Sequence, residues 1–217
     1  MVRNYQPLAI SYKLSGNKMK KDIIWANCEF KIGAMDIEAI PATHLNEIAF
    51  AGRSNVGKSS LVNAITGRNS LVRVSKTPGC TRQLNFFELS EQIYLVDMPG
   101  YGFAQRAKKE KYGWGRLITE YLTGRVRLRR IFLLIDSRHG LKEGDIEIMK
   151  LLDKKAVTYQ IVLTKIDELK EAELQKVIEE TTLKIKKHPA AFPEIIVTSS
   201  ERKLGIDVIR KEILGLI

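Results

Sequence analysis

The residues most suited to chemistry form a glycine-rich run, Gly-Arg-Ser-Asn-Val-Gly-Lys-Ser, at positions 52–59. It fits the pattern GxxxxGK(S/T), in which the glycines let backbone N–H groups turn inward around phosphate oxygens. Lys58 would reach the terminal phosphates, and the Ser59 hydroxyl would bind Mg²⁺. The run predicts a nucleoside triphosphate site without specifying the base. The candidate phosphate-binding residues are Gly52, Arg53, Ser54, Asn55, Val56, Gly57, Lys58, Ser59 and Ser60.

A second motif, Asp97-Met98-Pro99-Gly100, directly follows the apolar run 93–96. At the end of a strand, Asp97 would hold Mg²⁺ through a water molecule, and the Gly100 N–H would contact the γ-phosphate. Downstream of a phosphate loop, this motif predicts a segment that responds to the state of the nucleotide.

The choice of base is indicated by a third motif, Thr164-Lys165-Ile166-Asp167. The Asp167 carboxylate would accept hydrogen bonds from guanine N1–H and the 2-amino group, a donor pair that adenine lacks. The aliphatic stem of Lys165 would lie along the base. Guanine is favoured because another base would leave a buried carboxylate unpaired. Backbone N–H groups of Thr198, Ser199 and Ser200 would contact guanine O6.

The hydrophobic pattern predicts the elements that must position these motifs. Short apolar runs predict strands at 47–51, 84–89, 93–97, 131–136, 159–164 and 194–198, the second and third forming a hairpin. Helical spacing of apolar residues predicts helices at 58–66, 145–152, 171–187 and 206–217. Strands and helices alternate, and the motifs lie at strand ends. We therefore expect an α/β, Ras-like P-loop GTPase with a mostly parallel central sheet and helices on both faces.

Length and composition fit a single domain. The chain has 217 residues, of which 44% are hydrophobic and 28% charged, as in ordinary globular proteins. We expect a loose extension over 1–22 and one G domain over 23–217. Cys28 and Cys80 form no CxxC pair, so neither a disulfide framework nor a zinc knuckle is supported. No apolar run approaches the ~20 residues of a membrane span, and we expect a cytoplasmic protein.

The net charge of +11 is concentrated in residues 100–130, which hold nine basic and two acidic groups. Basic side chains interleaved with aromatic rings would attract phosphates and stack on unpaired bases, so this segment predicts an RNA contact. The alternative is a solvated basic face over core aromatics. A helical stripe of Trp114, Leu117, Ile118, Tyr121 and Leu122 supports that alternative for the aromatic residues.

Taken together, residues 47–200 resemble the EngB ribosome-biogenesis GTPases of bacteria, within the TrmE-Era-EngA-EngB-Septin-like superfamily. The resemblance lies in GRSNVGKSS from Gly52, SKTPGCT from Ser75, DMPGYGFA from Asp97, Trp114 with Tyr121 and Leu122, DSRHGL from Asp136 followed by Asp145, and TKID from Thr164. It implies binding of GTP and GDP with Mg²⁺, a large ribosomal subunit and its rRNA as partner, and a need for the protein in normal cell division and septation. We expect a monomer without a DNA partner.

The resemblance also places a switch loop after residue 75. Its nucleotide-contacting residues would be Gly79, Cys80, Thr81, Arg82 and Gln83. Thr81 would be a Mg²⁺ ligand with Ser59 and Asp97, and Thr77 is the alternative. Lys58, Thr81 and Gly100 would be the catalytic groups. Cys80 and Arg82 depart from the usual family residues, which moves the positive charge of the loop by two residues and bears on its contact with a partner.

Two further positions bear on the rate of hydrolysis. Tyr101 stands where many GTPases have a Gln that orients the attacking water, so intrinsic hydrolysis should be slow. In related GTPases an Asn at the position of Asn55 coordinates K⁺, which makes K⁺ a candidate cofactor. Two functions stay open: a GTPase switch stimulated by the ribosomal particle, and a GTP-gated binding module of the division machinery with incidental hydrolysis.

Overall fold

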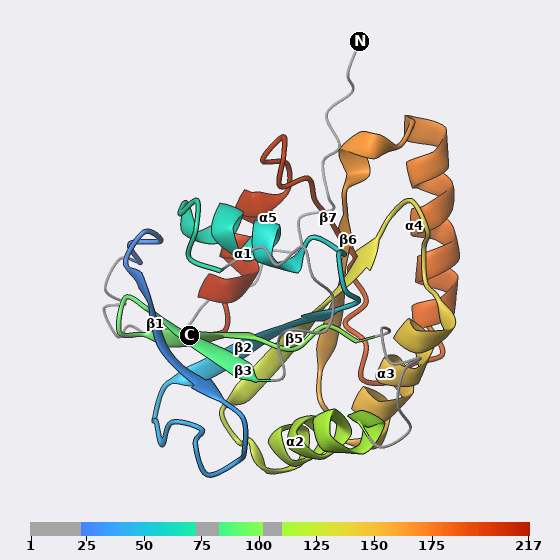
Figure 1. Ribbon diagram of the computed structural model, residues 1–217. Helices are drawn as coiled ribbons and strands as arrows, with labels where there is room; N and C mark the ends of the chain where they lie inside the picture. Colours follow the sequence, from blue (N-terminus) through green and yellow to red (C-terminus); the bar gives the residue numbers. More distant parts are fainter. Residues whose placement is uncertain (1–22, 73–82, 102–109) are drawn as a thin grey trace, which may run out of the picture.

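A seven-stranded, mostly parallel sheet forms the centre of the protein (Figure 1). The computed structural model describes residues 23–72, 83–101 and 110–217, and for residues 110–115 the backbone alone. The strands are β1 (Cys28–Ala34), β2 (Asn46–Gly52), β3 (Leu84–Leu89), β4 (Ile93–Asp97), β5 (Leu128–Asp136), β6 (Tyr159–Thr164) and β7 (Ile196–Val197). The helices are α1 (Lys58–Thr66), α2 (Glu110–Gly124), α3 (Glu143–Lys154), α4 (Glu171–Ile185) and α5 (Ile206–Leu214), with the short 3₁₀ helix η1 (Ile166–Glu168).

The strand order is β1-β3-β4-β2-β5-β6-β7. From β4 to β7 all neighbours are parallel, whereas β1, β3 and β4 pair antiparallel. The expected hairpin of β3 and β4 is confirmed, and so is the α/β class with a mostly parallel sheet. The edge strand β1 is an addition that the hydrophobic pattern did not predict.

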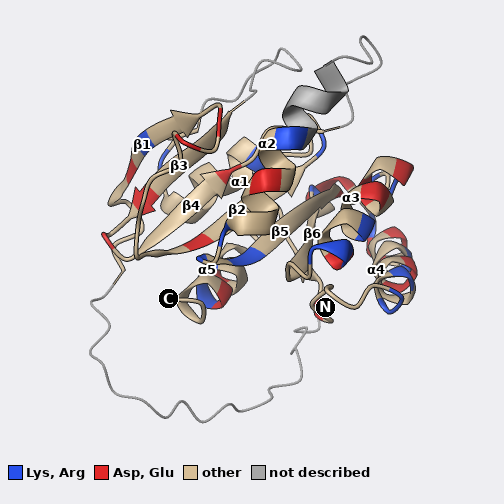
Figure 2. Ribbon diagram, turned by 90° about the horizontal axis from the view of Figure 1, so that it is seen from below, with Lys and Arg blue, Asp and Glu red and all other residues tan. Residues whose placement is uncertain are grey.

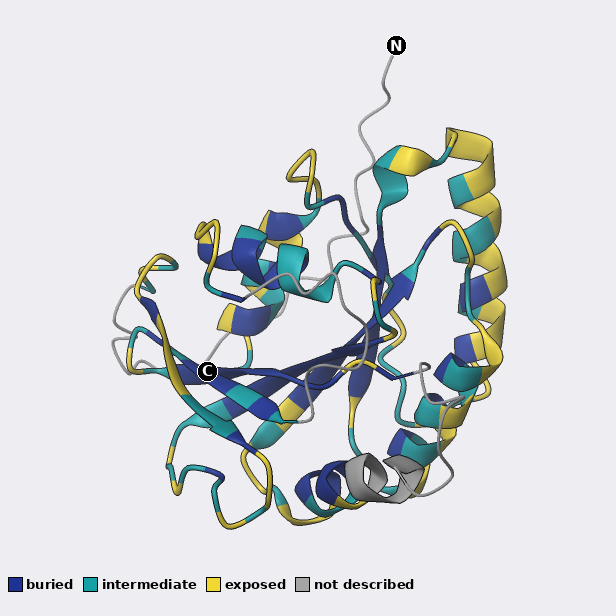
Figure 3. Cartoon of the chain, in the orientation of Figure 1, coloured by how far each residue is buried: buried dark blue, intermediate teal, exposed yellow. Residues whose placement is uncertain are grey.

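Helices cover both faces of the sheet (Figure 1). Along β2, Ile48 and Phe50 point into one apolar cluster and Ala49 and Ala51 into the other, because successive side chains of a strand face opposite sides. The first cluster is closed by α1 and α5, and the second by α2, α3 and α4. Figure 3 shows the central strands buried and the outer side of α4 exposed.

Helix α1 begins and ends at the predicted residues. Gly57 precedes it in a left-handed conformation, with φ of 98°, and Gly67 follows it with φ of 67°. Such φ values cost little only for glycine, which makes Gly67 an effective C-terminal stop. Leu61, Val62 and Ile65 are buried and hold the helix against the sheet.

Several element bounds differ from the predicted ones. Strand β5 starts at Leu128 rather than 131, and β7 is limited to Ile196–Val197 instead of 194–198. Just upstream of β7, Phe192 donates its N–H to the Tyr159 carbonyl, and Pro193 has no N–H to continue the pairing. Regular β7 pairing begins only after this interruption.

The expected extension over 1–22 lies outside the described residues. Ile23 and Trp25, directly after it, pack against the cluster beneath α1 and α5. None of the helices among the described residues combines the length and the apolar character that crossing a membrane requires.

Candidate functional site

The three predicted motifs meet at one edge of the sheet, outside the carboxyl ends of the parallel strands. The glycine-rich loop follows β2, Asp97 ends β4, and Lys165 follows β6. Asp136 ends β5, which lies between β2 and β6. This edge is where α/β sheets of this kind bind ligands.

The glycine-rich loop leaves a row of free backbone donors. Leu61 donates the first helical hydrogen bond, to the Gly57 carbonyl at 2.9 Å. Within the described residues, the N–H groups from Gly57 to Ser60 have no backbone acceptor, and no side chain caps α1. These donors add to the positive end of the helix dipole, and the first turn of α1 holds no acidic residue. The loop is therefore built to bind an anion.

Lys58 and Asp97, predicted to serve the phosphates and the metal, lie against each other. The Lys58 ammonium contacts the Asp97 carboxylate, and only 4% of Asp97 is exposed. The Asn85 amide lies 3.5 Å from the second carboxylate oxygen. The Ser59 hydroxyl makes no hydrogen bond within the described part of the chain. A serine hydroxyl and a carboxylate are hard oxygen ligands, which suits Mg²⁺.

The segment after Asp97 is tied back to the glycine-rich loop. Tyr101 donates its N–H to the Gly52 carbonyl, and Ser54 donates its N–H to the Tyr101 carbonyl, each at 3.3 Å. A Cβ at Gly100 would lie 3.0 Å from the Ser54 hydroxyl oxygen. Only glycine allows this close approach without a shift.

The Tyr101 side chain is engaged elsewhere. Its hydroxyl donates a 2.7 Å hydrogen bond to Asp145, near the start of α3, and only 8% of the residue is exposed. Burial, followed by the charge of Asp145, raises the pKa of Tyr101 well above its ordinary value. Burial likewise raises the pKa of Asp145. This partnership was missed at the sequence level, where Asp145 is only part of a family motif.

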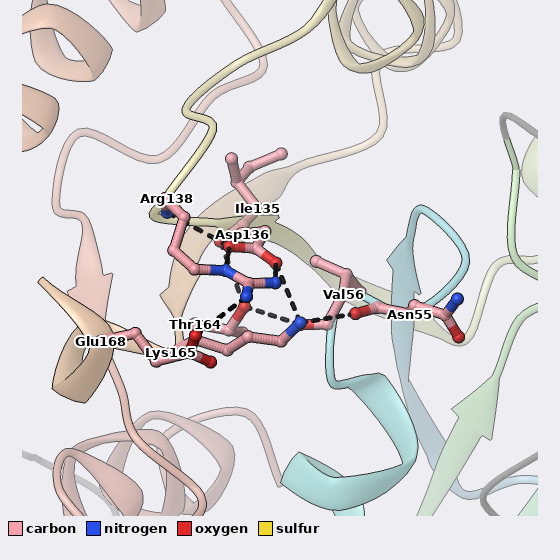
Figure 4. Close-up of polar contacts among 8 residues, drawn as sticks. All are labelled: Asn55, Val56, Ile135, Asp136, Arg138, Thr164, Lys165 and Glu168. Carbon is pink, nitrogen blue, oxygen red and sulfur yellow. Dashed lines mark hydrogen bonds and ion pairs between the residues drawn. The ribbon is translucent and has the colours of Figure 1, made fainter. Parts of the chain in front are cut away.

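The base-reading motif contacts the phosphate loop (Figure 4). Lys165 donates its ammonium to the Asn55 carbonyl at 2.8 Å and pairs with Asp136 at 2.9 Å. The Thr164 hydroxyl donates to the Val56 carbonyl at 2.7 Å. The Asp167 carboxylate is half-buried and makes no hydrogen bond or ion pair within the described residues.

Of the three N–H groups predicted near guanine O6, two have partners. Thr198 donates to the Leu163 carbonyl at 2.7 Å and Ser199 to the Leu204 carbonyl at 3.1 Å. Within the described residues, the Ser200 N–H makes no such bond. Ser200 is thus the best placed of the three as a donor to a ligand.

Some predicted residues cannot be placed. Gly79, Cys80, Thr81 and Arg82 lie outside the described residues, as do the basic side chains 106–111 and the Trp114 ring. Gln83 is described, and its amide donates to the Asn85 side chain at 2.8 Å.

The basic segment is not one continuous patch in its described part. Arg125 pairs with the fully buried Glu47, to which the Tyr121 hydroxyl also donates, at 3.1 Å. Arg130 is buried against Phe192, 4.0 Å from the ring centre, and pairs with Glu212.

Two other arginines of the segment stay accessible. Arg127 and Arg129 are exposed and make no ion pair within the described residues. They lie at the amino end of β5, at the sheet edge opposite the glycine-rich loop and the loops that follow β4 and β6. Elsewhere, α3 and α4 carry both acidic and basic residues (Figure 2).

Comparison with known proteins agrees with this geometry. Residues 47–165 match the family model described as 50S ribosome-binding GTPase. The chain is 52% identical to a probable GTP-binding protein EngB of Rhodospirillum rubrum over 87% of this chain and 84% of that protein. It is 46% identical to the Ruegeria sp. (strain TM1040) protein of the same name, over 97% of each chain.

Solved structures share the fold. A crystal structure of a probable GTP-binding protein engB aligns with a TM-score of 0.62 at 26% identity, over 78% of this chain and 97% of that one. Era in complex with MgGDPNP and nucleotides 1506–1542 of 16S ribosomal RNA aligns with a TM-score of 0.62 at 24% identity, over 79% and 56%. The chain therefore belongs to the EngB family of GTP-binding proteins and is a GTPase.

Proposed function

We propose that the protein binds GTP with Mg²⁺ at the carboxyl edge of the sheet and hydrolyses it as a switch in assembly of the large ribosomal subunit. The observation that carries the nucleotide site is the run of N–H groups from Gly57 to Ser60 that have no backbone acceptor within the described residues, with Lys58 beside Asp97. These donors and the ammonium would hold the phosphates. Asp167 and the Ser200 N–H, which have no partner among the residues that the structure describes, would contact guanine.

Hydrolysis would follow from water attack on the γ-phosphorus, which breaks its bond to the β-phosphate oxygen and yields GDP and phosphate. Lys58 and the Gly100 N–H would stabilise charge on the γ-phosphate, and the N–H row would stabilise charge on the leaving β-phosphate. Ser59, Asp97 and Thr81 would hold Mg²⁺, which when bound neutralises charge on the phosphate oxygens.

Intrinsic hydrolysis is proposed to be slow because the residue after Gly100 does not orient water. A phenol cannot act as the amide of Gln does, and the Tyr101 hydroxyl is already engaged with Asp145. Stabilisation of the transition state would then come from a partner, from K⁺ held at Asn55, or from both. The partner that we propose is the large ribosomal subunit, through its rRNA.

The ribosomal role is supported by the family's description as ribosome-binding and by the exposed Arg127 and Arg129. Such a role in a cytoplasmic, monomeric assembly factor would make the protein necessary for division and septation. Lys108, Lys109 and Lys111, next to the switch, would add phosphate contacts.

Sedimentation with purified large subunits tests this role. We expect binding with a non-hydrolysable GTP analogue, weaker binding with GDP, and a steep fall with rising salt. Replacing Lys108, Lys109 and Lys111 by Ala should weaken the binding and its salt dependence. Arg116→Ala is the matched control, because Arg116 already pairs with Glu120. Salt-insensitive binding to a division protein, without binding to subunits, would favour the gated module instead.

A further inference from the structure

Asp136, at the carboxyl end of β5, collects four hydrogen bonds at the nucleotide edge (Figure 4). Arg138 donates its backbone N–H at 3.1 Å, its Nε at 2.9 Å and a terminal nitrogen at 2.6 Å. Lys165 supplies the fourth, at 2.9 Å. The two guanidinium bonds reach different oxygens of the carboxylate, a forked pairing that fixes orientation better than a single contact.

Lys165 is held in an unfavourable backbone conformation. Its φ of 59° lies in the left-handed region, and so does the φ of 65° at Asn55. The Lys165 ammonium joins these two residues through the Asn55 carbonyl. Strained residues of this kind persist where their surroundings hold them. For Lys165 those surroundings are the Asn55 carbonyl and Asp136.

A second contact of the network involves Glu168, the residue that follows Asp167. Arg138 donates to Glu168 at 2.8 Å, and Glu168 is the last residue of η1. Asp167 therefore sits between two residues, Lys165 and Glu168, that connect to Asp136 directly or through Arg138. The same network touches the phosphate loop at Asn55.

We propose that Asp136 and Arg138 are positioning residues that lock the guanine-reading loop against the phosphate loop and thereby set the rate of nucleotide release. This inference rests on the proposed GTP binding and deepens it. Neither residue would touch the nucleotide. Each would act through a loop residue that does, Asp136 through Lys165 and Arg138 through the Glu168 end of η1.

Electrostatics supports the lock. Only 13% of the Asp136 side chain is exposed, so its pairing is less screened than that of a surface ion pair. Burial alone would raise the pKa of Asp136, but the hydrogen bonds from Arg138 and Lys165 outweigh it and hold the pKa below its ordinary value. The carboxylate is therefore charged under all ordinary conditions.

The test measures dissociation of fluorescently labelled GDP from Asp136→Asn, which keeps the side-chain shape and removes the charge. We expect dissociation about tenfold faster, the loss typical of one charge-assisted hydrogen bond. The KM for GTP should rise, while kcat falls by less than about twofold, because the change acts on binding rather than on the reacting phosphate. Combining Asp136→Asn with Lys165→Met should accelerate dissociation by clearly less than the product of the two single effects, because Lys165 is one of the partners through which Asp136 acts.

Asp153→Asn is the matched control. The Asp153 side chain is similarly buried, at 17% exposed, and pairs with His188 at 2.6 Å at the far end of α3. Removing the Asp153 charge should leave the rate of GDP dissociation as in the wild type. If Asp136→Asn does not fold, Arg138→Gln is the second variant, because the Arg138 side chain is 36% exposed. GDP should dissociate from this variant about threefold faster than from the wild type.

Wild-type dissociation from a folded Asp136→Asn protein would overturn the inference, and so would additive effects in the double variant. A wild-type protein that fails to retain GDP would instead contradict the proposed function. The two failures are therefore distinguishable.

Discussion

The Tyr101 hydroxyl donates a 2.7 Å hydrogen bond to the Asp145 carboxylate, whose other oxygen accepts the Lys142 N–H at 2.8 Å. The backbone of Tyr101 is meanwhile bonded to Gly52 and Ser54. The residue after Gly100 therefore connects the phosphate loop to the first turn of α3. The two backbone bonds restrain Tyr101 and with it the neighbouring Gly100 N–H, whereas the side-chain bond anchors Tyr101 to α3.

Tyr101→Phe should destabilise the protein with little effect on chemistry. It leaves a buried carboxylate short of one donor, which should lower the free energy of unfolding by about 1–3 kcal/mol. The kcat for GTP should change less than about threefold, whereas loss of a group acting on the transition state typically costs a factor of about 100 or more. Urea unfolding and phosphate release measure the two quantities.

Tyr94→Phe is the control for that substitution. The Tyr94 hydroxyl donates to Glu88 at 3.0 Å, and the Glu88 side chain is 19% exposed, so water can replace the lost donor. Tyr94→Phe should lower the free energy of unfolding by less than about 1 kcal/mol. An equal loss of unfolding free energy in the two variants would contradict the assigned role of Tyr101. So would a large fall in kcat in Tyr101→Phe alone.

The fold was largely predictable because apolar runs and flanking glycines mark most of its helices and strands in the local sequence. Helix α1, bounded by Gly57 and Gly67, and strand β6 match their predicted bounds. Strand β1 was missed because three consecutive residues, Glu29–Lys31, are exposed, so it lacks the usual alternation, and because its register shifts between Phe30 and Ile32. It pairs with β3, whose residues lie fifty or more positions later in the chain, and so distant a contact is not visible in the local sequence pattern.

The part of the site that could be predicted consists of the residues within recognisable sequence motifs. The motif residues of the three loops meet as expected, whereas the contacts that support them are tertiary. The bond of Tyr101 to Asp145 and the tie of Asp136 to Lys165 join residues far apart in sequence. Charge counting also failed for Arg125 and Arg130, because the carboxylates that neutralise them, Glu47 and Glu212, come from distant segments.

Asp167→Asn should change the preferred base. An amide cannot accept both hydrogen bonds from guanine, so affinity for GTP should fall about hundredfold, the loss of one to two bonds to a charged group. Affinity for xanthosine triphosphate should rise, because its C2 carbonyl can accept from the new amide. Measuring both nucleotides on one preparation cancels errors in the active fraction. Unchanged GTP affinity would remove Asp167 from the base site.

The lowered pKa of Asp136 predicts a pH dependence of stability with a definite sign. A carboxyl whose folded pKa lies below its ordinary value of 3.8 stabilises the fold above that pH, and the contribution is lost as the pH falls below it. The difference in unfolding free energy between wild type and Asp136→Asn should therefore be constant near neutrality and shrink below about pH 4. A difference that grows on acidification would contradict this assignment.

Asn55→Gly should separate the side chain of Asn55 from its backbone. Glycine accepts the φ of 65° and keeps the carbonyl that Lys165 uses, so only the amide is lost. If the amide holds K⁺, wild-type hydrolysis should be faster in K⁺ than in Na⁺, and the variant should lose that difference. Equal K⁺ stimulation in both proteins would place the ion elsewhere.

The most direct test of the proposed function is phosphate release from GTP with and without purified large ribosomal subunits, in K⁺ and in Na⁺ buffer. We predict slow release by the protein alone and a clear acceleration by the subunits, greatest in K⁺. Absence of any acceleration in either salt would contradict the ribosome-stimulated switch and leave the GTP-gated binding module as the better account.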